Sequence, residues 1–311
     1  MESFMMAARV VVPMAIMVGI GAMLRIGKIS DAETMKKVDK ITYNLLMPIL
    51  MFYNIYKTDF TQLHDVGYIL YGAVGLTILF LIAMFVVPKL IPNRATAASY
   101  GQAIIRSNYI LFGAAVAQSI YGDGNIGLIL LMSAVAVPMF NCYSAIVLEA
   151  GRHGTASIKK LLLAVVKNPT MIATALGLLV NFSGLVIPEL LVDVIQDLSG
   201  MTTPLSFLSI GVTLTFRTIG KKSYLISGIA LRLAIIPLIF VLGGIALGYR
   251  GQELCALLIL FAAPVAVSSY PMAVAMGADG DFAAQMVAVS TLACLPTIFV
   301  WTYVLNQLQM L

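Results

Sequence analysis

Long apolar stretches dominate the chain, and short polar connections separate them. About 20 predominantly apolar residues are enough for a helix to cross a bilayer, and ten stretches approach that length. The pattern therefore predicts ten transmembrane helices and an all-α integral membrane protein. In chain order the expected spans are Met5–Ile26, Ile41–Tyr56, Val66–Val87, Ala98–Tyr121, Ile126–Leu148, Pro169–Ile187, Leu198–Phe216, Tyr224–Leu247, Leu254–Met276 and Phe282–Leu305.

Composition narrows the class of protein further. Apolar residues make up 60% of the 311 residues and charged residues 11%, against about 45–50% and about 25% in soluble domains. So few charges cannot cover a water-facing surface of this size, which excludes a soluble enzyme, a nucleic-acid-binding protein and a disordered chain. Cys142, Cys255 and Cys294 lie in apolar stretches at no metal-ligand spacing, and the sequence has no phosphate-binding glycine-rich loop. We therefore expect no metal, no cofactor and no enzymatic activity.

Positive charges collect in alternate connections. The connections after the first, third, fifth and seventh expected helices hold most of the 19 basic residues, whereas the even-numbered connections hold only Lys57 and Arg250. Cytoplasmic loops carry an excess of lysine and arginine. The pattern predicts a multi-pass protein of the cell membrane, with both termini outside and the odd-numbered loops in the cytoplasm. It also accounts for the net charge of +5, so nothing is left that would indicate a nucleic acid partner.

The two halves of the chain repeat a set of landmarks at a nearly constant offset. The offset is 156 residues for two early pairs and 158 for two later pairs. Residues 1–150 and 151–311 each hold five expected spans, an odd number, so the halves insert with opposite orientation. Inverted five-helix repeats are typical of secondary transporters, whose site lies at the repeat interface near the middle of the membrane. The pairs are Pro13 with Pro169, Pro48 with Pro204, Gly122 with Gly280, and Pro138 with Pro296.

Polar residues and proline interrupt one expected helix in each half. Residues 98–121 contain Arg106 and Asn108, and residues 254–276 contain Pro264. The repeat offset places Asn108 opposite Pro264, near the centre of both spans. A proline there removes one hydrogen bond of the helix, and the freed backbone groups need a polar cavity or neighbouring helices. We expect two broken helices that cross and aim half-helix N-termini, the positive ends of their dipoles, at a ligand.

Seven short motifs extend the pattern along essentially the whole chain. They are Leu46–Phe52, Asn108–Gly113 with Tyr121–Gly122, Lys167–Pro169, Arg232–Leu233 with Pro237, Ala263–Pro271, Ser290–Leu292, and Leu295–Pro296. Each is weak alone, but together and in order they resemble the auxin efflux carrier family. That family includes the plant PIN-FORMED transporters and bacterial malate or malonate permeases.

The resemblance implies a fold related to bile-acid transporters and sodium/proton antiporters, with two inverted five-helix repeats and crossed fourth and ninth helices. It also implies a scaffold domain of helices 1, 2, 6 and 7, a transport domain of helices 3–5 and 8–10 that moves as an elevator, and a homodimer. Many family members carry a proline in the break of the fourth helix and another just after its glycine. This chain has Ser107 and Ala114 or Ala115 at those places, so we expect a milder break there.

The candidate substrate-binding residues lie at the expected crossing and in the helices beside it. They are Arg106, Ser107, Asn108, Tyr109, Asn141, Pro264, Ser268, Ser269 and Tyr270, with Pro48 and Pro204 on the opposing scaffold wall. Other interpretations stay open. Asn108, Asn141 and the serine hydroxyls are also typical of polar contacts between membrane helices, and Arg106 could extend its side chain towards the cytoplasm. For Arg232, the favoured role is structural bonding to unwound carbonyls.

Charged residues inside the expected spans indicate the sign of the charge on the ligand. No aspartate or glutamate falls in the middle of any span, whereas Arg106 and Arg232 lie within spans, and an intramembrane charge is a functional hypothesis by default. We expect a secondary transporter of small organic anions, carboxylates such as malate, malonate or auxin-like acids. Two alternatives stay open: a non-transporting membrane sensor of the same fold, and a cation-coupled antiporter, which the missing membrane carboxylates disfavour.

Overall fold

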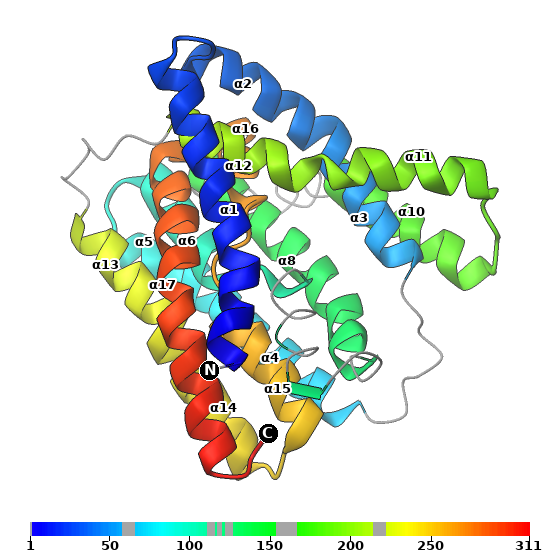
Figure 1. Cartoon of the computed structure of the whole chain (residues 1–311), viewed down its shortest axis with the longest axis vertical. Coiled ribbons are helices and arrows are strands. Elements are labelled where there is room, and N and C mark those ends of the chain that lie inside the picture. The colour runs from blue at the N-terminus through cyan, green and yellow to red at the C-terminus, as the bar shows by residue number, and fades with distance from the viewer. Residues whose placement is uncertain are drawn as a thin grey trace.

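Helices make up almost all of the computed structural model (Figure 1), which describes residues 2–57, 66–110, 116, 120–121, 127–153, 167–213 and 222–311. In chain order they are α1 (Glu2–Ile26), α2 (Ala32–Ile41), the π-helical η1 (Thr42–Leu46), α3 (Met47–Tyr56), α4 (Gly67–Phe85), α5 (Val87–Leu90), α6 (Arg94–Ile105), α8 (Gly127–His153), α10 (Pro169–Ser183), α11 (Glu189–Gly200), α12 (Thr202–Thr213), α13 (Lys222–Ala230), the π-helical η3 (Leu231–Ile235), α14 (Ile236–Ala246), α15 (Gly251–Ala262), α16 (Ser269–Ala275) and α17 (Gly280–Gln307). The all-helical prediction is confirmed for these residues. Strand-like pairing among them is limited to one isolated antiparallel β-bridge.

Four helical stretches of the described chain are long and apolar enough to cross a bilayer. They are Gly67–Leu90, Leu131–Arg152, Lys222–Ala246 and Gly280–Gln307, and the shorter apolar helices are Ala15–Ile26, Pro169–Ser183 and Gly251–Ala262. Large apolar side chains such as Phe85, Leu179 and Leu238 are exposed on the outside of the molecule. Lipid, unlike water, solvates such faces at no cost. The coarse prediction of a multi-pass membrane architecture therefore agrees with the structure, in which several of the expected spans are shorter or interrupted.

Two prolines near the starts of α3 and α14 have the same local surroundings. Pro48 and Pro237 each lie at the start of their helix, and each follows a five-residue π-helical segment, η1 or η3. Proline has no backbone N–H, and its ring clashes with the carbonyl four residues earlier. A wider π-helical turn accommodates both defects. Residues 32–56 therefore form one continuous helical run, whereas the apolar pattern predicts a start at Ile41.

The polar connection expected over residues 27–40 is helical for much of its length. Asp31 caps α2 by accepting a hydrogen bond from the N–H of Thr34 at 2.8 Å, and this bond holds the pKa of the exposed carboxyl below its usual value. One face of α2 packs against α12 and α16. That packing buries Asp39, which the sequence placed in a loop, to 1% exposure.

A further helix, α11, occupies the expected connection between the sixth and seventh spans. It begins after Pro188 and carries the apolar residues Leu190, Leu191 and Val194 exposed on one side. The hydroxyl of Tyr53 on α3 donates to Oε1 of Gln196 at 2.8 Å, which fixes α11 on α3. The search for long apolar stretches missed this helix because its charged residues lower its mean hydropathy.

The helices form two groups on either side of the molecule. α1 packs along α12, and α3 packs along α10; Figure 1 shows α3, α10 and α11 together on one side. α13, α14 and α17 lie on the opposite side. Between them, residues 254–262 of α15 are completely buried against α4, α8, α14 and α17. The core of the molecule therefore surrounds the point at which α15 ends.

Candidate functional site

Two helices stop in the interior of the molecule, and each continues as extended backbone. α6 ends at Ile105 and α15 ends at Ala262. Arg106 has φ −88° and ψ 111°, and Ala263 has φ −65° and ψ 151°. Both helices expected to be broken are therefore broken, close to the predicted positions.

The two extended segments pair with each other. The N–H of Asn108 donates to the carbonyl of Pro264 at 2.8 Å, and the N–H of Ala266 donates to the carbonyl of Arg106 at 3.2 Å. These bonds join the two residues, Asn108 and Pro264, that the sequence offset places opposite each other. They also satisfy backbone groups for which lipid offers no partner.

The break after α6 is complete, so the expectation of a milder break was wrong. Ser107, which stands where many family members have proline, pairs with Val265 in an antiparallel bridge. The N–H of Val265 donates in turn to the hydroxyl of Ser290 on α17 at 3.1 Å. Pairing with the other segment holds Ser107 in extended conformation, so a proline at this position is not required.

Arg232 on η3 bonds to the ends of both broken helices. Its guanidinium donates to the carbonyls of Ile104 at 3.1 Å, Leu260 at 3.1 Å and Ala263 at 2.9 Å, and the side chain is fully buried. The last carbonyls of a helix have no partner within it, and they carry the negative end of its dipole. The predicted structural role of Arg232, bonding to unwound carbonyls, is confirmed.

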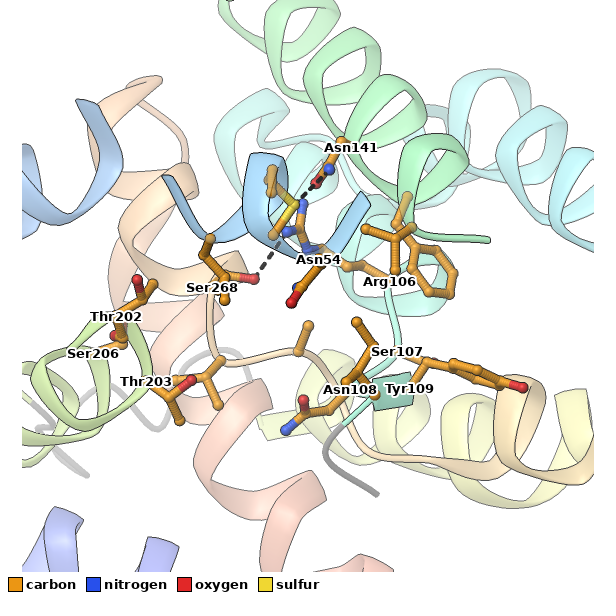
Figure 2. Close-up of a pocket in the computed structure, with 17 residues that line it drawn as sticks. Asn54, Arg106, Ser107, Asn108, Tyr109, Asn141, Thr202, Thr203, Ser206 and Ser268 are labelled. Carbon is orange, nitrogen blue, oxygen red and sulfur yellow. Dashed lines mark hydrogen bonds between the residues drawn. The ribbon is translucent and has the colours of Figure 1, made fainter. Parts of the chain in front are cut away.

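A cavity of about 190 Å³ lies beside the crossing (Figure 2). Its walls come from α3, α8, α12 and the two extended segments. The lining residues are Leu50, Met51, Asn54, Arg106, Ser107, Asn108, Tyr109, Ile110, Val137, Phe140, Asn141, Thr202, Thr203, Ser206, Ala266, Val267 and Ser268.

Arg106 gives this cavity its charge. It is the one charged side chain among the described lining residues, none of which is a carboxylate. Its guanidinium donates to the hydroxyl of Ser268 at 2.9 Å and to the sulfur of Met272 at 3.4 Å. The side chain is 3% exposed, so it stays at the crossing and does not extend to water.

Several polar atoms around the cavity have no hydrogen-bond partner within the described chain. They include Nδ2 of Asn108, Oγ of Ser107 and Oδ1 of Asn141. The Nδ2 atom of Asn141 contacts the sulfur of Met51 at 2.8 Å. Leaving a buried polar group unsatisfied costs about 1–3 kcal/mol. Unpartnered donors and an acceptor at one cavity therefore indicate a place where a polar ligand or water binds.

Comparison with known proteins decides the family. The family described as "Membrane transport protein" matches residues 4–302. The chain belongs to this family. It is the auxin efflux carrier family, so the resemblance carried by the sequence motifs is confirmed. An "Uncharacterized transporter" of Methanothermobacter thermautotrophicus is 24% identical over 97% of this chain and 99% of its own length. Both findings point to a membrane transporter and not to an enzyme.

In this member of the auxin efflux carrier family, most of the predicted site residues line the cavity. The lining includes Arg106, Ser107, Asn108, Tyr109, Asn141 and Ser268. Figure 2 shows the ring of Tyr109 pointing away from the cavity. Pro264 lies in the paired segment and is absent from the lining, as are Ser269 and Tyr270 on α16. The hydroxyl of Tyr270 instead shares a hydrogen bond of 3.0 Å with Thr213 on α12.

The opposing wall comes from the predicted helices but not from the predicted prolines. Pro48 and Pro204 do not line the cavity, whereas their neighbours on α3 and α12 do. Sequence reasoning missed the polar members of this wall, which are Asn54, Thr202, Thr203 and Ser206. The available signal was the presence of polar residues within two turns of a proline inside an apolar span.

Proposed function

We propose that this protein is a secondary transporter of small organic anions and that the cavity beside the helix crossing binds a carboxylate group of the substrate. The main support for this proposal is the positive charge of the cavity. Arg106 lines it with no carboxylate among the described lining residues. Guanidinium groups bind carboxylates through strong, charge-assisted hydrogen bonds, so an anion is the ligand that the cavity favours.

The other lining groups suit the remaining parts of such a substrate. The amide of Asn108 offers an unpartnered donor, and Thr202, Thr203 and Ser206 offer hydroxyls from the opposite wall (Figure 2). Val137 and Phe140 supply apolar surface for the carbon chain. Polar groups that fix the orientation of a ligand beside an apolar surface are typical of small-molecule sites.

The size of the cavity favours short acids. Its volume of about 190 Å³ lies below the roughly 300–1,000 Å³ typical of sites for drug-sized ligands. Malonate and malate therefore fit the proposal better than a bulky acid such as indole acetate.

The position of the cavity fits alternating access. α1, α3, α10 and α12 correspond to the scaffold helices that the resemblance implies, and α8 with the two extended segments belongs to the implied transport domain. The cavity takes lining residues from both groups. We propose that the two groups move past each other as in an elevator, with the inverted repeats 1–150 and 151–311 giving the two end states.

Substituting Asn108 with alanine is expected to raise the half-saturating concentration for malonate or malate uptake about 10- to 150-fold. A hydrogen bond to a charged group is worth about 1.5–3 kcal/mol, and about 1.4 kcal/mol is a factor of ten in affinity. Arg106→Gln is expected to have an effect at least as large because it removes the charge. Uptake of labelled acid by proteoliposomes measures both effects.

Asn44→Ala is the matched control: Asn44 lies on η1, is exposed and does not line the cavity, so this variant should transport like the wild type. Uptake that is indifferent to Asn108→Ala and Arg106→Gln would contradict the proposed site. Saturable binding without flux would favour the sensor interpretation. Sodium or proton flux without organic acid uptake would favour the antiporter.

A further inference from the structure

A carboxylate is buried where α2 meets α12 and α16. Asp39 is 1% exposed, and neither of its carboxylate oxygens has a hydrogen-bond partner of good geometry. The hydroxyls of Ser209 on α12 and Tyr270 on α16 lie against it. Asp39 precedes the expected span Ile41–Tyr56 by two residues, so it lies near the end of the 27–40 connection.

The groups around this carboxylate are hydroxyls. The hydroxyl oxygen of Ser209 on α12 is also buried without a partner. So is the hydroxyl oxygen of Thr42, which follows Asp39 by about one helical turn. The hydroxyl of Tyr270 shares its hydrogen bond with Thr213. Asp39, Thr42, Ser209, Thr213 and Tyr270 form what we call the Asp39 cluster. Its unpartnered atoms are oxygens that can accept a hydrogen bond or a cation.

The helices packed against α2 bring no positive charge to the Asp39 cluster. Within the described chain, α12 has no charged or titratable residue, α16 has only Tyr270, and η1 has only Tyr43. The hydroxyl of Tyr43 accepts a hydrogen bond from Asn168 at 2.9 Å. The other charged residues of α2 are exposed; they are Glu33, Lys36, Lys37 and Lys40. A buried carboxylate without a counter-ion is costly in its charged form.

We propose that Asp39 is a proton-binding site and that its protonated form holds α16 against α2 and α12. A carboxylate oxygen takes a proton from a hydronium ion on the side of the 27–40 connection: an O–H bond of the hydronium ion breaks, a carboxyl O–H bond forms, and a water molecule is left. The new O–H then donates to the hydroxyl of Ser209 or Tyr270. The reverse step returns the proton to the same water.

Two further observations agree with a proton as the ligand. Burial raises the pKa of the Asp39 carboxyl to about 6, and the neighbouring hydroxyls of Ser209 and Tyr270 partly oppose this rise. The proton therefore binds and leaves near physiological pH. A sodium ion needs several oxygen ligands around a space of its own, whereas Asp39 is 1% exposed and both of its carboxylate oxygens are buried.

The consequence for transport rests on the proposed function. α2 continues into the scaffold helix α3, whereas α16 belongs to the implied transport domain. Ser268, which bonds to Arg106 in the cavity, immediately precedes α16. Protonation of Asp39 thus acts on the boundary between the two groups, and through α16 on the wall of the cavity. We expect uptake by the wild type to change as the pH passes about 6, and uptake by Asp39→Asn to be independent of pH there.

The site itself can be tested without substrate. The folded protein binds this proton more tightly than the unfolded chain, so the midpoint of thermal unfolding should fall as pH rises through about 6. Asp39→Asn imitates the protonated carboxyl, so its midpoint should be flat across this range. Glu33→Gln, on the exposed face of the same helix, is the matched control and should keep the wild-type slope.

Infrared spectroscopy gives a second, direct readout. The band of the protonated carboxyl should disappear from the wild type as pH rises through about 6. Tyr270→Phe should move that midpoint to higher pH because the carboxylate loses a hydroxyl that favours its charged form. This test needs no folded Asp39→Asn protein.

An Asp39→Asn protein with the wild-type pH slope would overturn the proposal, as would a wild-type band that does not titrate near this pH. Stabilisation of the wild type, but not of Asp39→Asn, by sodium chloride over choline chloride would show a sodium site instead. Asn108→Ala should raise the half-saturating concentration for uptake and keep the pH-dependent unfolding. The proton site and the proposed transport function can therefore fail separately.

Discussion

Replacing Arg232 with methionine is expected to destabilise the protein by about 3–9 kcal/mol, since the three carbonyls that Arg232 bonds would be left buried and unsatisfied at about 1–3 kcal/mol each. These carbonyls belong to Ile104, Leu260 and Ala263, at the ends of α6 and α15. Water cannot replace the guanidinium because the side chain is fully buried. The total stability of a protein is only about 5–15 kcal/mol, so little folded protein should survive in detergent. Thermal unfolding and the monodisperse fraction after purification measure the effect.

Arg250→Met is the matched control for this prediction. Arg250 also donates to backbone carbonyls, those of Ile245 at 2.9 Å and Tyr249 at 2.7 Å, but it is exposed. In Arg250→Met, water can donate hydrogen bonds to those carbonyls in place of the guanidinium. Surface substitutions usually change stability by no more than about 0.5 kcal/mol. If both variants are equally stable, Arg232 does not hold the broken helices together.

The crossing was predictable from the sequence because membranes restrict what an interrupted helix can do. Asn108 and Pro264 stand at matching positions in two apolar spans, and each implies backbone groups that lack a partner within their own helix. Lipid cannot satisfy such groups, so they must pair with each other or face a cavity. The observed bond between the N–H of Asn108 and the carbonyl of Pro264 is the first of these outcomes.

Features that depend on distant partners were not predictable in the same way. Ser107 is a serine without helix-breaking character of its own, and only the segment around Val265 makes it extended. Asp39 falls in the polar connection expected over residues 27–40, and its burial is caused by α12 and α16 from the second half of the chain. Asn54 and Thr203 looked like ordinary polar residues of a span until the fold placed them on one cavity.

The close contact between α1 and α12 gives the second large expected effect. Gly21 on α1 and Gly211 on α12 face each other so closely that a methyl group on Gly21 would meet the carbonyl of Leu208, and one on Gly211 would meet the carbonyl of Val18. The obstacles are backbone atoms, which cannot rotate away as a flexible side chain would. Gly21→Val and Gly211→Val are each expected to force the helices apart and to cost about 1–3 kcal/mol or more. The midpoint of thermal unfolding measures the loss.

Gly19→Ala separates this steric effect from the general effect of replacing a glycine in a membrane helix. A Cβ atom on Gly19 meets nothing within 4 Å, and alanine favours the helix by about 0.8–1.0 kcal/mol over glycine, so this variant should be at least as stable as the wild type. α12 also carries Thr202 and Ser206 of the cavity wall. Displacing α12 should therefore lower stability and uptake together, whereas Asn108→Ala should lower uptake alone. A Gly21→Val protein with wild-type stability would mean that α1 and α12 can separate without cost, and the rigid scaffold required by an elevator would lose its support.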